Sequence, residues 1–161
     1  MAQLLIVYHS RTGGSRQMAT AAADGARAET MTVLRTADVA GPEDLLRADG
    51  YLFCAPENLA AMSGPMKDFF DRCYYPLLGR IEGRPYAQMI CAGSDGSNAA
   101  RQIARIAQGW RLRVVQAPMI LCTHAQTPEA ILAEKTISEA DLGQCRALGA
   151  ALAAGLEMGA F

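Results

Sequence analysis

The segment from Ser10 to Ser15 contains the residues best suited to chemistry in this sequence. It reads Ser-Arg-Thr-Gly-Gly-Ser and leads directly into an alanine-rich stretch of good helix formers. A helix leaves its first backbone amides without partners and carries positive partial charge at that end. Hydroxyls at Ser10, Thr12 and Ser15 would add donors, and the two glycines let the backbone close around an anion. The pattern indicates a phosphate site, to which Arg11 could add charge.

A Ser/Gly-rich turn that merely caps a helix would have a similar sequence. The segment alone therefore fits both a phosphate site and a simple capping turn. Two further polar segments fall at comparable places, Pro56 to Gly64 and Gly93 to Asn98. Each follows a short apolar run. In Gly93 to Asn98, Ser97 could also act simply as the N-cap of the next helix.

The elements that must position these segments follow from hydrophobic patterning. Short apolar runs predict strands buried on both faces, at Leu4–Tyr8, Met31–Leu34, Tyr51–Ala55, Tyr86–Ala92 and within Leu112–Cys122, where Pro118 could break the strand. Helical patterns lie between and after them, at Ser15–Arg27, Pro42–Arg47, around Met66–Cys73, around Ile103–Trp110 and from Ser138 onward. Ser138 with Asp141 three residues later resembles a capping box.

This alternation predicts an α/β fold, a three-layer doubly wound parallel sheet of five strands, in a single domain over residues 1–161. Ligands of such sheets bind beyond the carboxyl ends of the strands, where the strand order reverses. The three polar segments would therefore meet at one edge of the sheet.

Several kinds of ligand site are excluded because their sequence motifs are missing. No Gly-x-Gly-x-x-Gly follows the first strand, and no Gly-x-x-x-x-Gly-Lys-Ser/Thr occurs. No cysteine has an arginine six positions later, as phosphatases on this kind of sheet require, and the first and third strands lack the acidic ends of a receiver domain. A net charge of −1 argues against nucleic acid. Five scattered cysteines and two histidines predict neither a disulfide frame nor a metal site.

No uncharged stretch approaches the roughly 18 residues needed to span a bilayer, so membrane insertion is not expected. The first residues lack a basic region and a cleavage site, so we expect no signal peptide and a cytoplasmic protein.

Two segments together resemble the flavodoxin-like FMN-binding proteins. Ser10 to Ser15 is similar to the Ser/Thr-x-Thr-Gly-x-Ser/Thr loop that holds the FMN phosphate in that family. Pro56 to Arg72 is similar to the Pro-x-x-x-x-x-Met-Ser-x-x-Met-Lys-x-Phe-x-Asp segment of WrbA-like NAD(P)H:quinone oxidoreductases. The likeness extends in strand order over essentially the whole chain.

The resemblance implies a 2-1-3-4-5 strand order and FMN across the carboxyl edge. The flavin would carry the chemistry, so no protein side chain is assigned a catalytic role. The cofactor-binding residues it implies are Ser10, Arg11, Thr12, Gly13, Gly14, Ser15, Pro56, Glu57, Asn58, Leu59, Met62, Gly93, Ser94, Asp95 and Gly96.

The most favoured function is an FMN-dependent oxidoreductase that moves electrons from the co-substrate NAD(P)H to a quinone or similar small acceptor. The first alternative is a flavodoxin-type one-electron carrier. The strongly acidic face, aromatic sandwich and loop glycine typical of carriers are missing here, and Leu59 and Ala60 stand where oxidoreductases of the WrbA type have an aromatic residue and a glycine. The second alternative is a flavodoxin-like domain with weak FMN binding and no turnover. Family resemblance suggests homodimers or homotetramers. The apolar faces of the helices are, however, expected to pack against the sheet, where they are not available for contacts between subunits.

Overall fold

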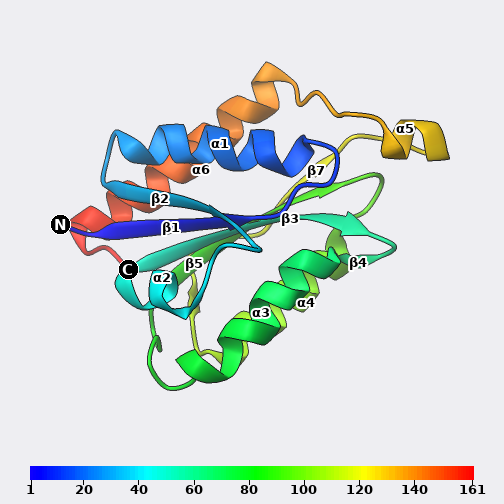
Figure 1. Ribbon diagram of the computed structural model, residues 1–161. Coiled ribbons are helices and arrows are strands. Elements are labelled where there is room, and N and C mark those ends of the chain that lie inside the picture. The colour runs from blue at the N-terminus through cyan, green and yellow to red at the C-terminus, as the bar shows by residue number, and fades with distance from the viewer.

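The computed structural model describes residues 1–161 and has one mainly parallel sheet at its centre (Figure 1). Its strands are β1 (Gln3–Tyr8), β2 (Met31–Thr36), β3 (Gly50–Asn58), β4 (Ala61–Met62), β5 (Pro85–Ala92), β6 (Arg113–Val114) and β7 (Met119–Cys122). The order is β2-β1-β3-β5-β6, with β7 also parallel to β5 and with β4 antiparallel to β3. Counting β6 and β7 as one interrupted strand, this is the predicted 2-1-3-4-5 order, which is confirmed.

The predicted fifth strand is interrupted between Val114 and Met119. Its two halves pair with opposite ends of β5, Arg113 beside Pro85 and Met119 beside Met89. Proline has no amide hydrogen to donate, so Pro118 cannot take a full part in a ladder. The break therefore lies where the sequence predicts it.

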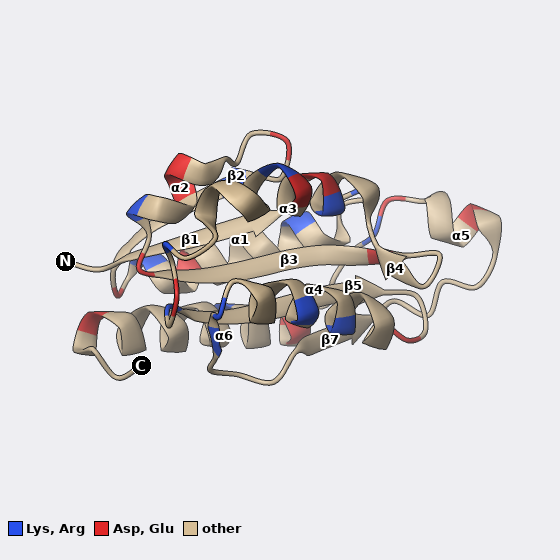
Figure 2. Cartoon of the chain, turned by 90° about the horizontal axis from the view of Figure 1, so that it is seen from below, with Lys and Arg blue, Asp and Glu red and all other residues tan.

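Helices cover both faces of the sheet. They are α1 (Gly14–Arg27), α2 (Pro42–Arg47), α3 (Gly64–Leu77), α4 (Ser97–Gly109), α5 (Pro128–Leu132) and α6 (Glu139–Met158). Helices α1 and α6 lie on one face, and α3 and α4 lie on the other, which gives three layers (Figure 1). Charged residues of both signs lie mainly on the helices and connecting segments (Figure 2).

The alternating side chains of the strands divide the core into two layers. Leu4 and Ile6 of β1 pack beneath α1 and α6, whereas Leu5 and Val7 pack beneath α3 and α4. All four side chains are fully buried. Burial on both faces explains why β1 reads as a continuous apolar run rather than as an alternating one.

The helix starts agree with the sequence in one case and differ in another. Ser138 caps α6, because its Oγ accepts a hydrogen bond from the Asp141 amide at 3.1 Å. Ser97, considered above as an N-cap, is instead the first residue of α4. The N-cap is Gly96, whose φ of 88° is a left-handed conformation that glycine adopts without a steric penalty.

Helices α1 and α6 approach each other through glycines. A Cβ at Gly25 would overlap the carbonyl of Arg146, and one at Gly149 would overlap the carbonyl of Ala22. Small residues at these positions bring the two helices into backbone contact, which fixes the position of α1 over the sheet.

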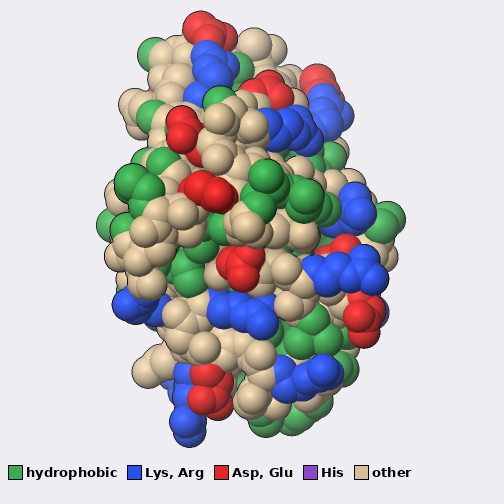
Figure 3. Space-filling model, turned by 90° about the vertical axis from the view of Figure 1, so that its left-hand side faces the viewer, with side chains coloured by type: hydrophobic (Ala, Val, Ile, Leu, Met, Phe, Trp, Pro, Cys, Tyr) green, Lys and Arg blue, Asp and Glu red, His purple; other side chains and the backbone are tan.

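The surface at the amino ends of the strands mixes acidic, basic and apolar side chains without a dominant charge (Figure 3). No helix combines the length and the apolar character that crossing a bilayer requires.

Two glycines of α6 allow a matched test of the helix packing. We expect Gly149→Ala to lower the free energy of unfolding by about 1–3 kcal/mol, because the added methyl group overpacks the contact with α1. Gly143→Ala should raise it by up to about 1 kcal/mol, since nothing lies within 4 Å of its Cβ position and alanine is the better helix former. Urea unfolding of both variants measures the difference, and a Gly149→Ala protein as stable as Gly143→Ala would contradict the close packing.

Candidate functional site

A cavity opens at the carboxyl edge of the sheet, where the three polar segments meet. Its volume is about 70 Å³. It therefore accommodates a compact group such as a small anion. Its walls are Ser10, Arg11, Thr12, Gly14, Ser15, Pro56, Glu57, Asn58, Cys91, Ala92, Gly93, Thr123, Ala125, Ile131 and Lys135.

The loop between β1 and α1 is folded around its own first serine. The Oγ of Ser10 accepts a hydrogen bond from the Gly13 amide at 3.0 Å, and Gly13 takes a left-handed conformation with φ of 94°. No side chain caps α1. The amides of Gly14, Ser15 and Arg16 consequently have no acceptor within the helix. We refer to this group of amides, with the Ser10–Ser15 loop, as the anion nest.

Ser15 adds a buried hydroxyl to the wall of the cavity. Its side chain is 1% exposed, and its Oγ has no hydrogen-bond partner in the protein. A buried hydroxyl without a partner costs about 1–3 kcal/mol, and such groups are few in folded proteins. Since Ser15 lines the cavity, the hydroxyl is a ready donor to an anion bound there.

Gly14 and Cys91 form the floor of the cavity. A Cβ on Gly14 would lie 2.5 Å from the Cys91 Sγ, so any larger residue would require the Cys91 side chain to shift. Burial raises the pKa of the Cys91 thiol to about 11, and the positive charge of Lys135 partly opposes this. The thiol stays protonated near neutral pH and acts as a packing group.

Glu57 connects the second and third polar segments. Its Oε1 accepts from the Gly96 amide at 2.8 Å, and its Oε2 accepts from the Ala99 amide at 3.1 Å. The carboxylate therefore caps α4 from the end of β3 and faces the positive end of that helix. This role fixes the Gly93–Gly96 turn relative to Pro56 and is one that the sequence did not reveal.

The hairpin after Glu57 has strained backbone at its tip. Leu59 and Ala60 have φ angles of 51° and 62°, a conformation that costs a non-glycine residue roughly 1–2 kcal/mol. The turn is held from outside, because the Asn98 Nδ2 donates to the Ala60 carbonyl at 2.5 Å. Leu59 is fully exposed at the tip.

Nine of the fifteen residues predicted to bind the cofactor line this cavity, and six do not. Leu59 points to solvent, and Met62 is buried and lines a separate groove between α3 and α4. Ser94 and Asp95 are exposed on the turn, where Asp95 accepts from the Ser97 amide at 3.1 Å. Gly13 and Gly96 act through their backbone conformation as the N-caps of α1 and α4.

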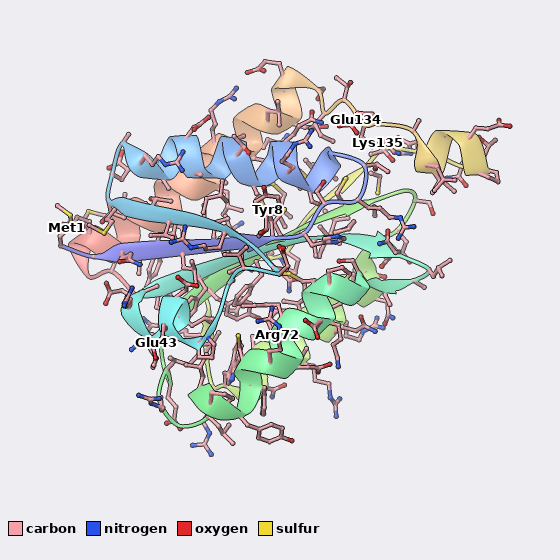
Figure 4. The ribbon with its side chains drawn as sticks, viewed as in Figure 1. Met1, Tyr8, Glu43, Arg72, Glu134 and Lys135 are labelled. Carbon is pink, nitrogen blue, oxygen red and sulfur yellow. The ribbon has the colours of Figure 1, made fainter.

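Six lining residues were not predicted from the sequence, and Lys135 is the charged one among them. It lies in the segment between β7 and α6, residues 124–137, which we term the strap, and its Nζ donates to the Thr12 Oγ1 at 3.3 Å. Figure 4 shows Lys135 and its neighbour Glu134 beside the start of α1. The only signal in the sequence was its rarity, since the chain has two lysines, and rarity does not show what a residue contacts.

His9 has a structural role. Its Nδ1 and the Ser63 Oγ are 2.8 Å apart, which links the end of β1 to the start of α3. Burial and the charge of Arg11 lower the pKa of His9 below its ordinary value, so the ring is neutral at pH 7. His9 is therefore a hydrogen-bonding group at the end of β1.

The chain is similar in sequence and in fold to several known proteins. A family model described as NADPH-dependent FMN reductase matches residues 40–127. A flavodoxin of Aquifex aeolicus is 37% identical over 98 residues, or 60% of this chain and 53% of that protein. An NAD(P)H dehydrogenase (quinone) of Acidithiobacillus ferrooxidans is 34% identical over 94 residues, or 45% of this chain and 47% of that protein.

A solved structure, described as a flavodoxin, WrbA-like protein from Agrobacterium tumefaciens, has a TM-score of 0.73 at 21% identity and covers 98% of this chain and 99% of that chain. At that identity the likeness concerns the fold. The chain spans about half the length of the curated relatives it matches.

Ser15 and Ser63 are both 1% exposed and differ in whether their hydroxyl has a partner, so they form a matched pair. We expect Ser15→Ala, measured by urea unfolding in buffer free of phosphate, to leave the free energy of unfolding unchanged or raised by up to about 1 kcal/mol. Ser63→Ala should lower it by about 1–3 kcal/mol, because it removes the partner of His9. Equal losses in the two variants would mean that the Ser15 hydroxyl is satisfied in the folded protein.

Proposed function

The chain belongs to the NADPH-dependent FMN reductase family, and we propose that it is an FMN-dependent oxidoreductase that passes electrons from NAD(P)H to a quinone or similar small acceptor. The predicted membership of the flavodoxin-like FMN-binding proteins is confirmed. FMN is the cofactor that this family implies, and NAD(P)H is its co-substrate. The observation that carries the proposal is the anion nest with its unpartnered Ser15 hydroxyl.

The residues present fit FMN at its terminal phosphate. The uncapped amides of Gly14 to Arg16 and the Ser15 hydroxyl are donors without acceptors, and Thr12 adds another hydroxyl. Positive charge comes from Arg11 and Lys135, both on the cavity wall. A phosphate monoester offers several acceptor oxygens and a negative charge opposite Arg11 and Lys135, whereas a neutral ligand would leave these positive charges without a counter-charge.

The remaining lining residues are assigned to the other parts of the cofactor. Pro56, Asn58 and Gly93 line the same cavity at the ends of β3 and β5, and we propose that they contact the flavin ring system. Glu57 is a positioning residue, because both its oxygens are engaged with α4. The contacts predicted for Leu59, Met62, Ser94, Asp95 and Gly96 stay predictions.

The chemistry itself belongs to FMN when it is bound, since a flavin takes two electrons from reduced nicotinamide and passes them to an acceptor. The balanced reaction is NAD(P)H + H⁺ + quinone → NAD(P)⁺ + hydroquinone. The chain binds the phosphate, orients the cofactor over the sheet edge and leaves that edge without an aromatic lid, because the Pro56–Ser63 segment has no aromatic residue.

A flavodoxin-type electron carrier is the second candidate, and the 37% identity to the Aquifex aeolicus flavodoxin supports it. Carriers use a strongly charged face to steer docking. The net charge of −1 favours the oxidoreductase.

Binding of FMN can be tested by adding a negative charge to the nest. We expect Thr12→Glu to weaken FMN binding by at least about 100-fold, because a carboxylate would face the phosphate at close range. Thr20→Glu is the control, since it adds the same charge to an exposed position of α1 two turns further along. Flavin fluorescence titration measures both, and similar affinities for the two variants would place the phosphate elsewhere.

Turnover separates the two candidate functions. We expect the FMN-loaded protein to oxidise NADH or NADPH in the presence of a soluble quinone, and the Thr12→Glu protein to do so at the rate of free FMN. A carrier would give no NAD(P)H oxidation above free FMN, yet would accept single electrons from a flavodoxin reductase. That second outcome would reject the oxidoreductase in favour of the carrier.

A further inference from the structure

The strap, residues 124–137, is fixed directly on the anion nest. The Lys135 amide donates to the Thr12 carbonyl at 2.8 Å. Gln17 clamps the strap from α1, because its Nε2 donates to the Lys135 carbonyl at 2.7 Å and its Oε1 accepts from the Ile137 amide at 3.0 Å. These backbone bonds hold the Lys135 Cα at the mouth of the nest irrespective of what its side chain does.

The Lys135 ammonium is oriented by its own segment. Its Nζ donates to the carbonyls of Ile131 at 2.8 Å and Ala133 at 2.6 Å, and the third and longest contact reaches the Thr12 Oγ1 at 3.3 Å. All three acceptors are neutral oxygens. The positive charge is thus held over the nest by carbonyl dipoles without a carboxylate to neutralise it.

The other cations nearby are placed differently. Arg16 forms an ion pair with Glu134 at 3.0 Å, and both side chains are largely exposed. Arg11 is exposed, and no hydrogen bond fixes its side chain. Lys135 is therefore the cation at the nest whose position is set by the protein and whose charge is left for a ligand.

From this placement we propose that Lys135 binds the terminal phosphate and makes the site specific for the phosphorylated flavin, FMN, over riboflavin. The inference rests on the proposed function, because it assumes that a flavin occupies the cavity. Lys135 lies beyond the stretch that matches the family model, residues 40–127. A phosphate takes the place of the Thr12 hydroxyl as the third acceptor, and this exchanges a long neutral contact for a charge-assisted one.

The size of the effect follows from the type of contact. A hydrogen bond between two charged groups contributes enough to change a dissociation constant by about 10- to 100-fold. Riboflavin has the same ring and ribityl chain without the phosphate, so the ratio of the riboflavin and FMN dissociation constants reports all contacts with the phosphate together. The change in this ratio between the wild type and a Lys135 variant isolates the role of Lys135.

The test compares Lys135→Met with Lys135→Arg and with Lys67→Met, which removes the chain's other lysine from an exposed pair with Asp71 on α3. Dissociation constants for FMN and riboflavin are measured by fluorescence quenching on the full chain, with far-UV circular dichroism to confirm folding. We expect Lys135→Met to weaken FMN binding by about 10- to 100-fold and riboflavin binding by less than about threefold. Lys135→Arg should restore most of the preference, and Lys67→Met should match the wild type.

The outcomes distinguish this inference from the proposed function. If the wild-type protein binds FMN and Lys135→Met has the same riboflavin-to-FMN ratio, Lys135 does not read the phosphate and the inference is overturned while the function stands. Equal weakening of both flavins would show a structural role of the strap and would overturn it as well. If the wild type binds neither flavin, the proposed function fails, and the inference fails with it.

Discussion

Helix α1 begins over the sheet edge with its first amides uncapped, and a buried hydroxyl beside them has no partner. Polar groups without hydrogen-bond partners lower the stability of a folded protein, and most buried ones have partners. Here they lie together, on the wall of one cavity, at the positive end of a helix that packs tightly against α6. An anion at this place satisfies the amides, the Ser15 hydroxyl and the helix dipole together, and the rest of the site is arranged around that position.

Glu57 shows how the fold keeps the second wall of the site in register with the first. Its carboxylate leaves the end of β3 and caps α4, which follows β5, so two loops on neighbouring strands cannot move independently. The strained Leu59–Ala60 turn lies immediately beyond it and is held by Asn98 of α4. The two contacts make the hairpin and the helix one unit, and backbone strain at the tip is sustained by bonds on both sides.

Much of this arrangement could be predicted from local patterns. Apolar runs located the strands, Pro118 marked the break in the fifth strand, and Ser138 marked the start of α6. The Ser10–Ser15 loop could be singled out as a candidate anion site because its hydroxyls and amides come from neighbouring residues in the chain. Lys135 could not, since it reaches Thr12 across 123 positions through a segment without periodicity. Glu57 was expected to contact the ligand, but its carboxylate caps α4. The residues next to an acidic side chain at a strand end do not show which of these two roles it has.

The direction in which the Met62 side chain points could not be predicted from the sequence either. A two-residue strand reverses the chain after Leu59, and this turns Met62 toward the groove between α3 and α4 rather than toward the cavity. The direction of a side chain after a tight turn depends on the backbone conformation of the turn. Leu59 and Ala60 adopt left-handed conformations, which leucine and alanine do not favour, so their sequence does not predict this turn.

The interruption of the outermost strand also affects how molecules of this protein meet one another. A long, straight border of unpaired amides and carbonyls invites another chain to add itself and begin fibrous association. Here that border is cut into a two-residue and a four-residue piece, with a proline just before the second. Copies of the chain that collide at this side therefore find no continuous strand with which to pair.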